Sequence, residues 1–557
     1  MTYIIADNIV SPLASGTQGN LQAVLEGRSA LRSYDHRFPQ VEPFCAALFE
    51  GLEPADGLSR FERLCVDAVG GVAEQAGKAL LSSERTVFVV SSTKGNIGML
   101  DGLTDIGLSL SAGRIAKCFS NPNTPVVVSN ACISGVCALI TAKRLLEAGE
   151  YDYVVVVGCD VISPFIVSGF QSFKALSPQP CRPFDKDRCG LNLGEAAACM
   201  VLSADEGEKD HALGAIVAGA VHNDANHISG PSRTGEGSYL CLRDVAPDDS
   251  NFLAFVNAHG TATAYNDEME SIAIERAGLQ HVPVNALKGC FGHTLGAAGI
   301  LETVLSLHAL RDGLILPTKG YAECGTSRRM DISSELRTTD KTEFIKLLSG
   351  FGGCNAAIRV ALLPANEQAT GGGDTGLTTV AEVHVTPVGV TLNGKSIELT
   401  EHGEGLLTEL YKTRVGDYPK FFKMDTLTRL GFVATELLLQ SVSEERFVPR
   451  DDRAVLFANR SASLKNDTDY LLTIAPDNYY PSPALFVYTL PNIVTGEVAI
   501  RNRYYGETSF FVLENELQME RLIPLAFRQK GTKSVLAGWT ECRSKDSFEA
   551  HIRLITI

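Results

Sequence analysis

The chain lacks a surplus of basic residues: 49 Lys and Arg stand against 65 Asp and Glu, which gives a formal net charge of −16. Nucleic acids and membranes are bound by basic faces, so neither is expected as a main partner. Long apolar runs are also missing; the most apolar stretch, 153–158, stops at Asp160 and is too short to span a bilayer. The N-terminus shows no basic stretch ahead of an apolar run, as a secretory signal would. A cytoplasmic location is therefore expected.

Cysteines number only 14 in 557 residues, too few for a disulfide framework, and no Cys-x-x-Cys pair occurs. The close pairs, Cys132 with Cys137 and Cys181 with Cys189, have no histidine or carboxylate at metal-ligand spacing beside them. We expect reduced cysteines and no metal. What the chain has is 45% hydrophobic residues and 51 glycines, a globular composition rich in tight turns. Its length predicts at least two structural units.

The order of short apolar runs predicts an α/β protein. Runs rich in β-branched residues alternate with small-residue helical stretches such as 136–148, which is typical of buried sheets; the runs lie at 85–90, 125–128, 153–157 and 252–256. A polar, glycine-rich segment follows. We therefore predict a domain at 1–365, a linker at 366–380 and a second unit at 381–557.

The second unit resembles the first half of the domain. The segments that begin at Phe61, Arg85, Thr124 and Val155 match segments that begin at Leu427, Arg453, Ser482 and Val535. In this alignment Ala484–Tyr488 copies the strand 125–128, and Ile493 takes the place of Cys132. Nothing in the second unit matches the region of His259 and His293. We expect a half-copy without a nucleophile.

The residues around Cys132 favour a nucleophile. The apolar run 125–128 leads into Ser129–Gly135 and then into a small-residue helix. A thiol at such a strand-to-helix turn is exposed at the sheet edge, where the helix N-terminus stabilises a thiolate. Most free cysteines are buried small hydrophobes, so this motif alone leaves a structural role equally open.

Two histidines stand in glycine-rich segments. His259 lies in Asn257–Thr263, and His293 lies in Lys288–Gly299, ahead of Glu302. Flanking glycines let backbone and substrate approach closely, which suits acid–base work. A lone histidine is more often structural, but two of them together with a strand-end cysteine indicate a catalytic site.

In their order and spacing these motifs resemble the elongating β-ketoacyl synthases. The signature is Asn-Ala-Cys-x-Ser-Gly at 130–135, His-Gly-Thr-x-Thr at 259–263, Lys-x-x-x-Gly-His-Thr-x-Gly-Ala-Ala-Gly at 288–299 and Gly-Phe-Gly-Gly-x-Asn at 350–355. It covers nearly all of residues 1–365. The resemblance implies a thiolase fold, with two βαβ-rich halves stacked in five αβαβα layers, and the second unit would add a thiolase-like half-domain.

The resemblance also implies roles for matching residues. Cys132 would accept the acyl chain from a carrier thioester. His259 and His293 would assist decarboxylation of a malonyl thioester and stabilise its enolate. Lys288 would tune the electrostatics around His293. The backbone N–H groups of Cys132 and Phe351 would form the oxyanion hole.

Implied substrate contacts come from four residues. Thr261 and Thr263 would bind the phosphopantetheine arm, and Phe351 and Gly352 would line the acyl site, with Phe351 as its gate. No cofactor is implied beyond the phosphopantetheine of an acyl carrier protein. That carrier is the implied partner, together with a second subunit or the chain's own tail in a dimer or pseudo-dimer.

Some features depart from the family pattern, and alternatives follow from them. Ala262 replaces Gly, Gly289 replaces Ser and Ser349 replaces an aromatic residue, which affects pocket shape. A CoA-dependent, thiolase-type acyltransferase would need a second cysteine, for which Cys354 is the candidate; the paired histidines and Lys288 argue against it. A non-elongating chain-length factor lacks the nucleophile, which suits only the tail. The pathway, fatty acid or polyketide and polyene synthesis, stays open.

Overall fold

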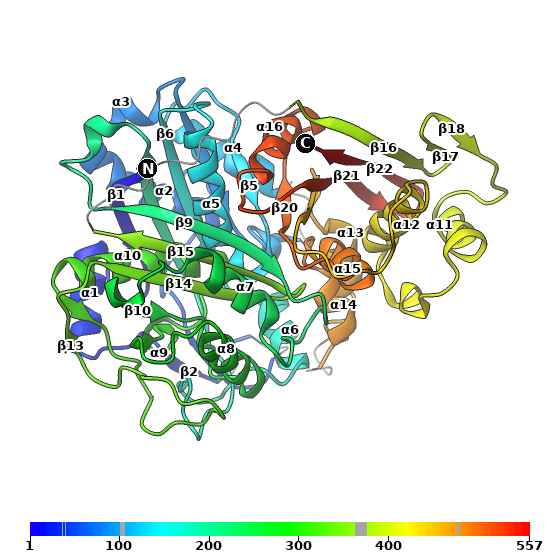
Figure 1. Ribbon diagram of the computed structural model, residues 1–557. Helices are drawn as coiled ribbons and strands as arrows, with labels where there is room; N and C mark the ends of the chain where they lie inside the picture. Colours follow the sequence, from blue (N-terminus) through cyan, green and yellow to red (C-terminus); the bar gives the residue numbers. More distant parts are fainter. Residues whose placement is uncertain (36, 39–40, 101–105, 363–375, 476–479) are drawn as a thin grey trace.

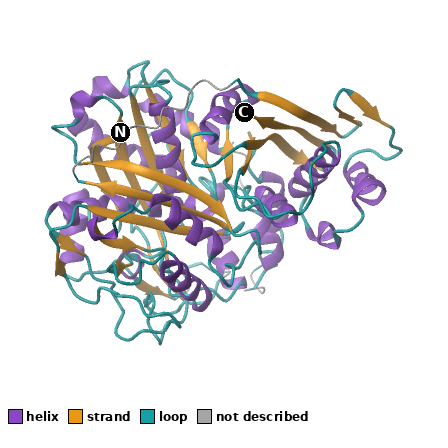
Figure 2. Cartoon of the chain, in the orientation of Figure 1, coloured by secondary structure: helices purple, strands orange, loops and turns teal. Residues whose placement is uncertain are grey.

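The computed structural model describes residues 1–557 except 36, 39–40, 101–105, 363–375 and 476–479. Figures 1 and 2 show an N-terminal domain, residues 1–362, and a tail, residues 376–557, side by side. Most of the predicted linker lies outside the described residues. Its last three residues belong to strand β16 (Thr378–Thr386), so the predicted boundary at 381 is three residues late. None of the helices in the described part is long and apolar enough to cross a membrane.

The first sheet of the domain has the order β5-β4-β6-β8-β1, in which β4 is parallel to both neighbours and the other two pairs are antiparallel. Its strands are β1 (Thr2–Val10), β4 (Thr86–Ser91), β5 (Val126–Val128), β6 (Tyr153–Asp160) and β8 (Ala196–Ser203). The predicted strands in this region are confirmed. Their apolar residues are buried, as expected where helices cover both faces.

A second sheet, in the order β11-β10-β14-β15-β9, completes the domain. Its strands are β9 (Gly214–Asn223), β10 (Leu253–Asn257), β11 (Val284–Asn285), β14 (Glu343–Gly350) and β15 (Cys354–Ala361). Between the sheets lie α5 (Ser134–Glu147) and α10 (Ala298–Arg311). The outer faces are covered by α2 (Arg60–Ala76), α7 (Glu236–Val245) and α8 (Ala264–Arg276). These are the five layers of the predicted thiolase fold.

The tail repeats the first sheet strand for strand. Its order is β20-β19-β21-β22-β16, and the sense of each pair matches that of β5-β4-β6-β8-β1. Its strands are β16, β19 (Arg453–Asn459), β20 (Thr508–Val512), β21 (Ser534–Ser544) and β22 (Ser547–Thr556), and β17 (Gly389–Leu392) and β18 (Lys395–Ile397) extend β16. Helices α12 (Thr426–Gln440), α15 (Ile493–Asn502) and α16 (Glu516–Ala526) pack on this sheet.

Helices α2 and α12 occupy equivalent places and begin in a similar way. At the start of α2 the Ser59 hydroxyl accepts the N–H of Glu62, and the Glu62 carboxylate accepts the N–H of Ser59, which is a capping box. At the start of α12 the Asp425 carboxylate accepts the N–H of Thr428. The predicted similarity between the segments at Phe61 and Leu427 falls on these first turns.

One of the four predicted similarities is wrong. Those at 85 and 453, and at 155 and 535, fall on β4 and β19 and on β6 and β21, but Ala484–Tyr488 belongs to helix α14 (Pro483–Tyr488). Ser482 caps this helix by accepting the N–H of Leu485, and Pro483 takes the first helical position, where no N–H is needed. A short apolar run does not distinguish a strand from a helix.

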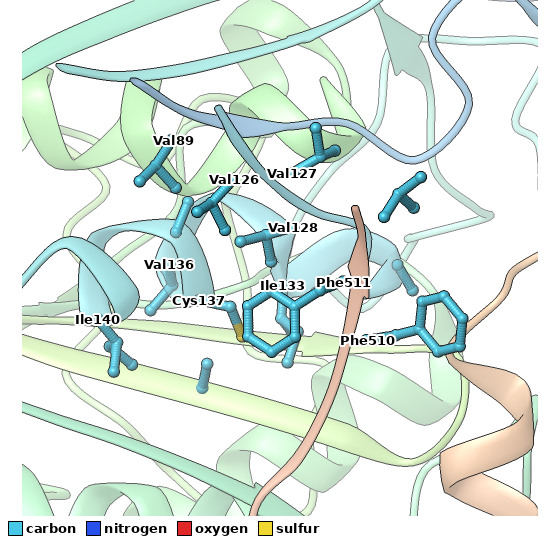
Figure 3. Close-up of a cluster of buried hydrophobic side chains, with 14 of the residues drawn as sticks. Val89, Val126, Val127, Val128, Ile133, Val136, Cys137, Ile140, Phe510 and Phe511 are labelled. Carbon is cyan, nitrogen blue, oxygen red and sulfur yellow. The ribbon is translucent and has the colours of Figure 1, made fainter. Parts of the chain in front are cut away.

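The true counterpart of β5 is β20, and these two strands join the two sheets. They pair antiparallel, with Val127 opposite Val512 and Val128 opposite Phe511. Figure 3 shows Phe511 packed against β5 and the start of α5, with Phe510 on the same strand. One hydrophobic core therefore runs from the domain into the tail.

The register of this pair identifies the tail residue at the position of Cys132. Because the pairing is symmetric, Val128 and Val512 are equivalent, and Glu516 follows Val512 at the distance at which Cys132 follows Val128. Ile493, which the sequence placed there, lies on α15 instead. The tail has a carboxylate where the domain has a thiol.

Candidate active site

Cys132 lies in the 3₁₀ turn η2 (Ala131–Ile133), between β5 and the N-terminus of α5. Ala131 has φ 49°, a left-handed conformation that costs free energy in a residue with a Cβ. Ser134 supports the turn: its hydroxyl donates to the Ala131 carbonyl at 2.6 Å and accepts the Asn130 N–H at 2.8 Å. The turn thus holds the thiol at the helix end.

The structure brings Cys132, His259 and His293 together. The sulfur and one nitrogen from each ring lie within 4.8 Å of one another. The ring centroids are 5.0 Å apart and the rings are nearly perpendicular. His259 follows β10, and His293 follows the short helix α9 (Lys288–Phe291). These atoms could also hold an ion, and the expectation that no metal binds stays a prediction.

Hydrogen bonds orient both histidines. His293 Nδ1 accepts the N–H of Leu295 at 3.3 Å, which places the proton of the neutral ring on the buried Nε2, an atom without a partner in the described structure. His259 Nδ1 is likewise buried and unpartnered. The backbone N–H groups of His259 and Gly260 donate to Glu270 at 2.6 and 2.8 Å. Unpartnered ring nitrogens in a buried site are available to a substrate.

A buried charge cluster adjoins the histidines. Glu302 accepts from Lys288 Nζ at 2.8 Å through one oxygen and from Lys346 Nζ at 2.5 Å through the other. Lys346 also donates to Asn257 Oδ1 at 2.7 Å and to the Ala258 carbonyl at 3.2 Å, just before His259. The sequence indicated Lys288 and Glu302 but not Lys346. The missed signal was a lysine inside an otherwise apolar strand, β14.

This cluster keeps the histidines neutral. Burial lowers the pKa of His259 and His293 well below the usual range, and the nearby ammonium groups of Lys288 and Lys346 lower it further. Burial also lowers the pKa of Lys346 to about 8. The pKa of Glu302 is lowered by the two lysines, against the opposing effect of burial. Neutral imidazoles that donate N–H bonds are thus maintained.

Burial raises the pKa of the Cys132 thiol to about 12, while Lys288 and the backbone N–H groups of Cys132 and Phe351 act in the opposite direction. Those two N–H groups are the ones predicted for the oxyanion hole, and both act on the reacting sulfur. Donors placed in this way stabilise the oxyanion of a thioester under attack.

Phe351 and Gly352 lie in the loop between β14 and β15, against the tail. The Phe351 carbonyl accepts from Asn492 Nδ2 of the tail at 2.8 Å. Gly352 has φ 94°, and a Cβ there would lie 2.7 Å from the same nitrogen, so only glycine fits. A Cβ on Gly496 of the tail would meet the Gly352 carbonyl at 2.5 Å. The tail thus packs closely against an oxyanion-hole loop.

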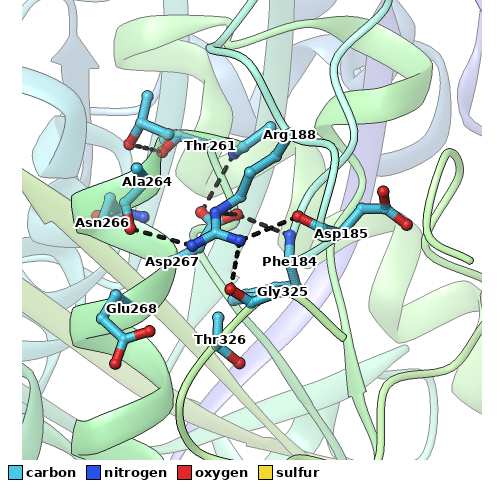
Figure 4. Close-up of polar contacts among 12 residues, drawn as sticks. Phe184, Asp185, Arg188, Thr261, Ala264, Asn266, Asp267, Glu268, Gly325 and Thr326 are labelled. Atoms are coloured by element: carbon cyan, nitrogen blue, oxygen red, sulfur yellow. Dashed lines mark hydrogen bonds and ion pairs between the residues drawn. The ribbon is translucent and has the colours of Figure 1, made fainter. Parts of the chain in front are cut away.

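Thr261 and Thr263 lie side by side, with hydroxyl oxygens 3.0 Å apart. Their loop is held by the buried Asp267, which accepts the Ala262 N–H at 3.1 Å and has Arg188 beside it at 3.9 Å (Figure 4). Ala262 has φ 63°, a conformation that glycine adopts more easily. The departure from the family's glycine therefore leaves the backbone path unchanged at some strain.

The remaining sequence candidates have structural partners. Cys354 is buried outside the trio, and its thiol donates to the Phe351 carbonyl at 3.2 Å, so the geometry does not favour a second catalytic cysteine. Beside Cys132 is a small pocket of about 20 Å³. Phe486 and Leu490 of the tail line it together with Phe351 of the domain.

The family model described as Beta-ketoacyl synthase, N-terminal domain, matches residues 3–207, and the one described as Beta-ketoacyl synthase, C-terminal domain, matches residues 213–322. The chain belongs to the β-ketoacyl synthase family. It is therefore an acyltransferase. Cys132, His259 and His293 all lie inside the matched ranges, and the tail lies outside them.

Two relatives illustrate the similarity of this β-ketoacyl synthase to known proteins. It is 29% identical over 417 residues to 3-oxoacyl-[acyl-carrier-protein] synthase 2 of Rhizobium meliloti, an alignment that covers 64% of this chain and 97% of the relative. It is 30% identical over 331 residues to Nodulation protein E of Rhizobium leguminosarum bv. trifolii, covering 54% and 82%.

Solved structures extend the comparison to the tail. The ishigamide ketosynthase/chain length factor matches 65% of the synthase and 99% of its own chain, with a TM-score of 0.60 and 25% identity. The PfaC Keto synthase-Chain length factor matches 100% of the synthase, tail included, and 78% of its own chain, with a TM-score of 0.75. At 14% identity the second likeness shows the fold alone.

Proposed function

We propose that this chain is a β-ketoacyl-[acyl-carrier-protein] synthase, which joins an acyl group held on Cys132 to a malonyl unit with loss of CO₂. The observation that carries the proposal is the approach of the Cys132 sulfur and two neutral, buried imidazoles to within 4.8 Å. Family membership supports it, as do relatives named 3-oxoacyl-[acyl-carrier-protein] synthase 2.

The first half-reaction loads the enzyme. The Cys132 sulfur attacks the thioester carbonyl, and the oxyanion lies between the N–H groups of Cys132 and Phe351. The carrier's phosphopantetheine leaves as a thiol that takes up the proton lost by Cys132. Thr261 and Thr263 bind the phosphopantetheine arm, with Gly352 beside the acyl group.

The second half-reaction extends the chain. The malonyl carboxylate leaves as CO₂, and its electron pair forms an enolate that accepts N–H bonds from His259 and His293. The enolate carbon attacks the acyl carbonyl, a carbon–carbon bond forms, and Cys132 departs as the thiolate. Lys288 and its partner Glu302 hold the electrostatic environment in which both rings stay neutral.

The partners and setting follow from this chemistry. The substrates arrive on an acyl carrier protein, no further cofactor is needed, and the enzyme works in the cytoplasm in fatty acid or polyketide and polyene-type synthesis. The tail is a catalytically silent, thiolase-like half that takes the place of a partner subunit. Its contacts with Phe351, Gly352 and the Cys132 pocket support a role in shaping the acyl site.

The test separates loading from decarboxylation. The purified chain is incubated with acyl-carrier thioesters, and the mass added to Cys132 is read from a digest. Wild type becomes acylated and then condenses with malonyl-carrier protein. Cys132→Gln does not become acylated but still releases CO₂ from malonyl-carrier protein, because both histidines remain. A Cys132→Gln enzyme that condenses at the wild-type rate would exclude the proposed function.

A further inference from the structure

An ion pair beside the acyl pocket has one partner in the domain and the other in the tail. Lys94 Nζ lies 2.7 Å from Asp467 Oδ1, and both side chains are buried. Lys94 also donates to the carbonyl of Thr489 and to the Ser463 hydroxyl at 3.4 Å, so all its hydrogen-bond partners come from the tail. Its ammonium also lies 5.5 Å from the centre of the Phe165 ring.

The backbone around Lys94 is held from below. The buried Asp160 accepts the N–H groups of Thr93 and Lys94 at 3.0 and 3.1 Å and the hydroxyl of Ser92 at 2.7 Å. The same carboxylate accepts the N–H of Gly296 at 2.7 Å. Because loop and ammonium are both fixed, the position of Lys94 is set by the fold and not by a free side chain.

Lys94 stands between two spaces of very different size. Lys94 and Thr93 line the pocket of about 20 Å³ at Cys132, and they also line a pocket of about 380 Å³ between domain and tail. Asp467 lines only the larger one. The smaller space is about what a single water molecule needs, whereas the larger one is of the size that holds a small ligand.

We propose that the Lys94–Asp467 pair is the end wall of the acyl site and limits this enzyme to short acyl groups. The inference rests on the proposed function. A plain alkyl chain that passed the pair would have to separate two buried charges. That loss equals the gain from burying roughly four to six methylene groups. A short acyl group on Cys132 avoids it.

The wild-type enzyme provides the first test. Full-length protein is offered acyl-carrier thioesters from acetyl to dodecanoyl at equal concentration, and the initial rate of Cys132 acylation is measured by mass. Acetyl and butyryl load, and octanoyl and longer groups load at least about tenfold more slowly, the effect of about two methylene groups that find no place. Equal rates along the series overturn the inference.

The second test removes the wall with a matched control. Lys94→Leu with Asp467→Leu replaces both charges by apolar groups, an exchange that buried pairs tolerate better than loss of one partner. The control is Arg144→Met with Glu507→Leu, another buried ion pair between domain and tail, at 2.9 Å, which lines neither pocket. The octanoyl-to-acetyl rate ratio rises more than about tenfold in the first variant and stays at the wild-type value in the control.

Each remaining outcome decides the matter. A folded wall variant with an unchanged ratio, or a control that raises the ratio equally, overturns the inference while leaving the proposed function intact. Failure of every acyl group to load on Cys132 in wild type overturns the proposed function and the inference with it. If the wall variant does not fold, the wild-type series decides alone.

Discussion

The N-terminal domain and the tail share one sheet plan but differ at a single turn. After β5 the turn carries Cys132, and two histidines from the second sheet approach it within 4.8 Å. After the equivalent β20 it carries Glu516, whose carboxylate accepts from His551 of the tail at 2.6 Å. Among its described residues the tail has no counterpart of the second sheet of the domain. A nucleophile turn therefore becomes catalytic only when a second sheet brings the acid–base groups to it.

The two halves also differ in what their shared edge does. In the domain β5 leads directly to the reacting thiol, whereas β20 serves to hold that strand in place. The tail then reaches further, with Asn492 at the Phe351 loop and Phe486 in the acyl pocket. The copy without a nucleophile thus contributes to the site of the copy that has one.

The strongest test of this contrast changes the two equivalent turn residues separately. Cys132→Ala lowers condensation at least about a thousandfold, because no group remains to carry the acyl chain. Glu516→Ala leaves condensation at the wild-type rate and removes only a partly exposed bond to His551. Steady-state assays with acyl- and malonyl-carrier protein compare them. Loss of activity in the Glu516 variant would show that the tail turn takes part in catalysis.

The shared edge is tested by a charge in its core. Phe511→Asp lowers the free energy of unfolding by at least about 3 kcal/mol and abolishes activity, since the carboxylate would lie where an aromatic ring packs on β5. Urea unfolding measures the change. The control, Leu517→Asp, alters a tail residue that is 78% exposed and shifts stability by less than about 0.5 kcal/mol. Equal stability of both variants would contradict a shared core.

The charge cluster of the second sheet is tested by its extra lysine. Lys346→Met lowers kcat roughly tenfold, about 1.4 kcal/mol of barrier. The histidines have a pKa below the usual 6.5 and must be neutral, so activity is lost as pH falls through that lowered value. Removing one ammonium raises the histidine pKa, so the acid limb of the kcat/KM profile moves to higher pH.

A matched control keeps this reading specific. Lys117→Met, at an exposed position on α4 (Leu108–Cys118), leaves the profile unmoved. The groups that face Lys346 are Glu302 and Lys288, with Glu270 further away, and none of them is altered. A Lys346 variant whose activity falls with an unshifted acid limb would indicate a packing role only.

The smallest expected effect lies at the strained loop. Ala262→Gly relieves a left-handed alanine but loosens the unfolded chain, so the free energy of unfolding changes by less than about 1 kcal/mol in either direction. Ala273→Gly, inside the regular helix α8, lowers it by at least about 1 kcal/mol. Urea unfolding of both compares them. A large loss at 262 would show that the methyl group itself stabilises the Thr261–Thr263 loop.

The sequence by itself determined the class of fold, the reaction family and the trio of Cys132, His259 and His293. Each of these residues stands in a short contiguous motif, and the flanking glycines and apolar runs already set the local backbone. Strand positions in the first sheet followed for the same reason. Local patterns of this kind are independent of the rest of the chain.

Only the tertiary structure decided how the tail joins the site. The sequence chose Ala484–Tyr488 as the copy of β5, whereas the strand that pairs with β5 is β20 and the residue at the place of Cys132 is Glu516. Lys346 and the Lys94–Asp467 pair likewise belong to no motif, because their partners lie far away along the chain. Such contacts depend on register and on packing between distant segments, which a linear pattern does not contain.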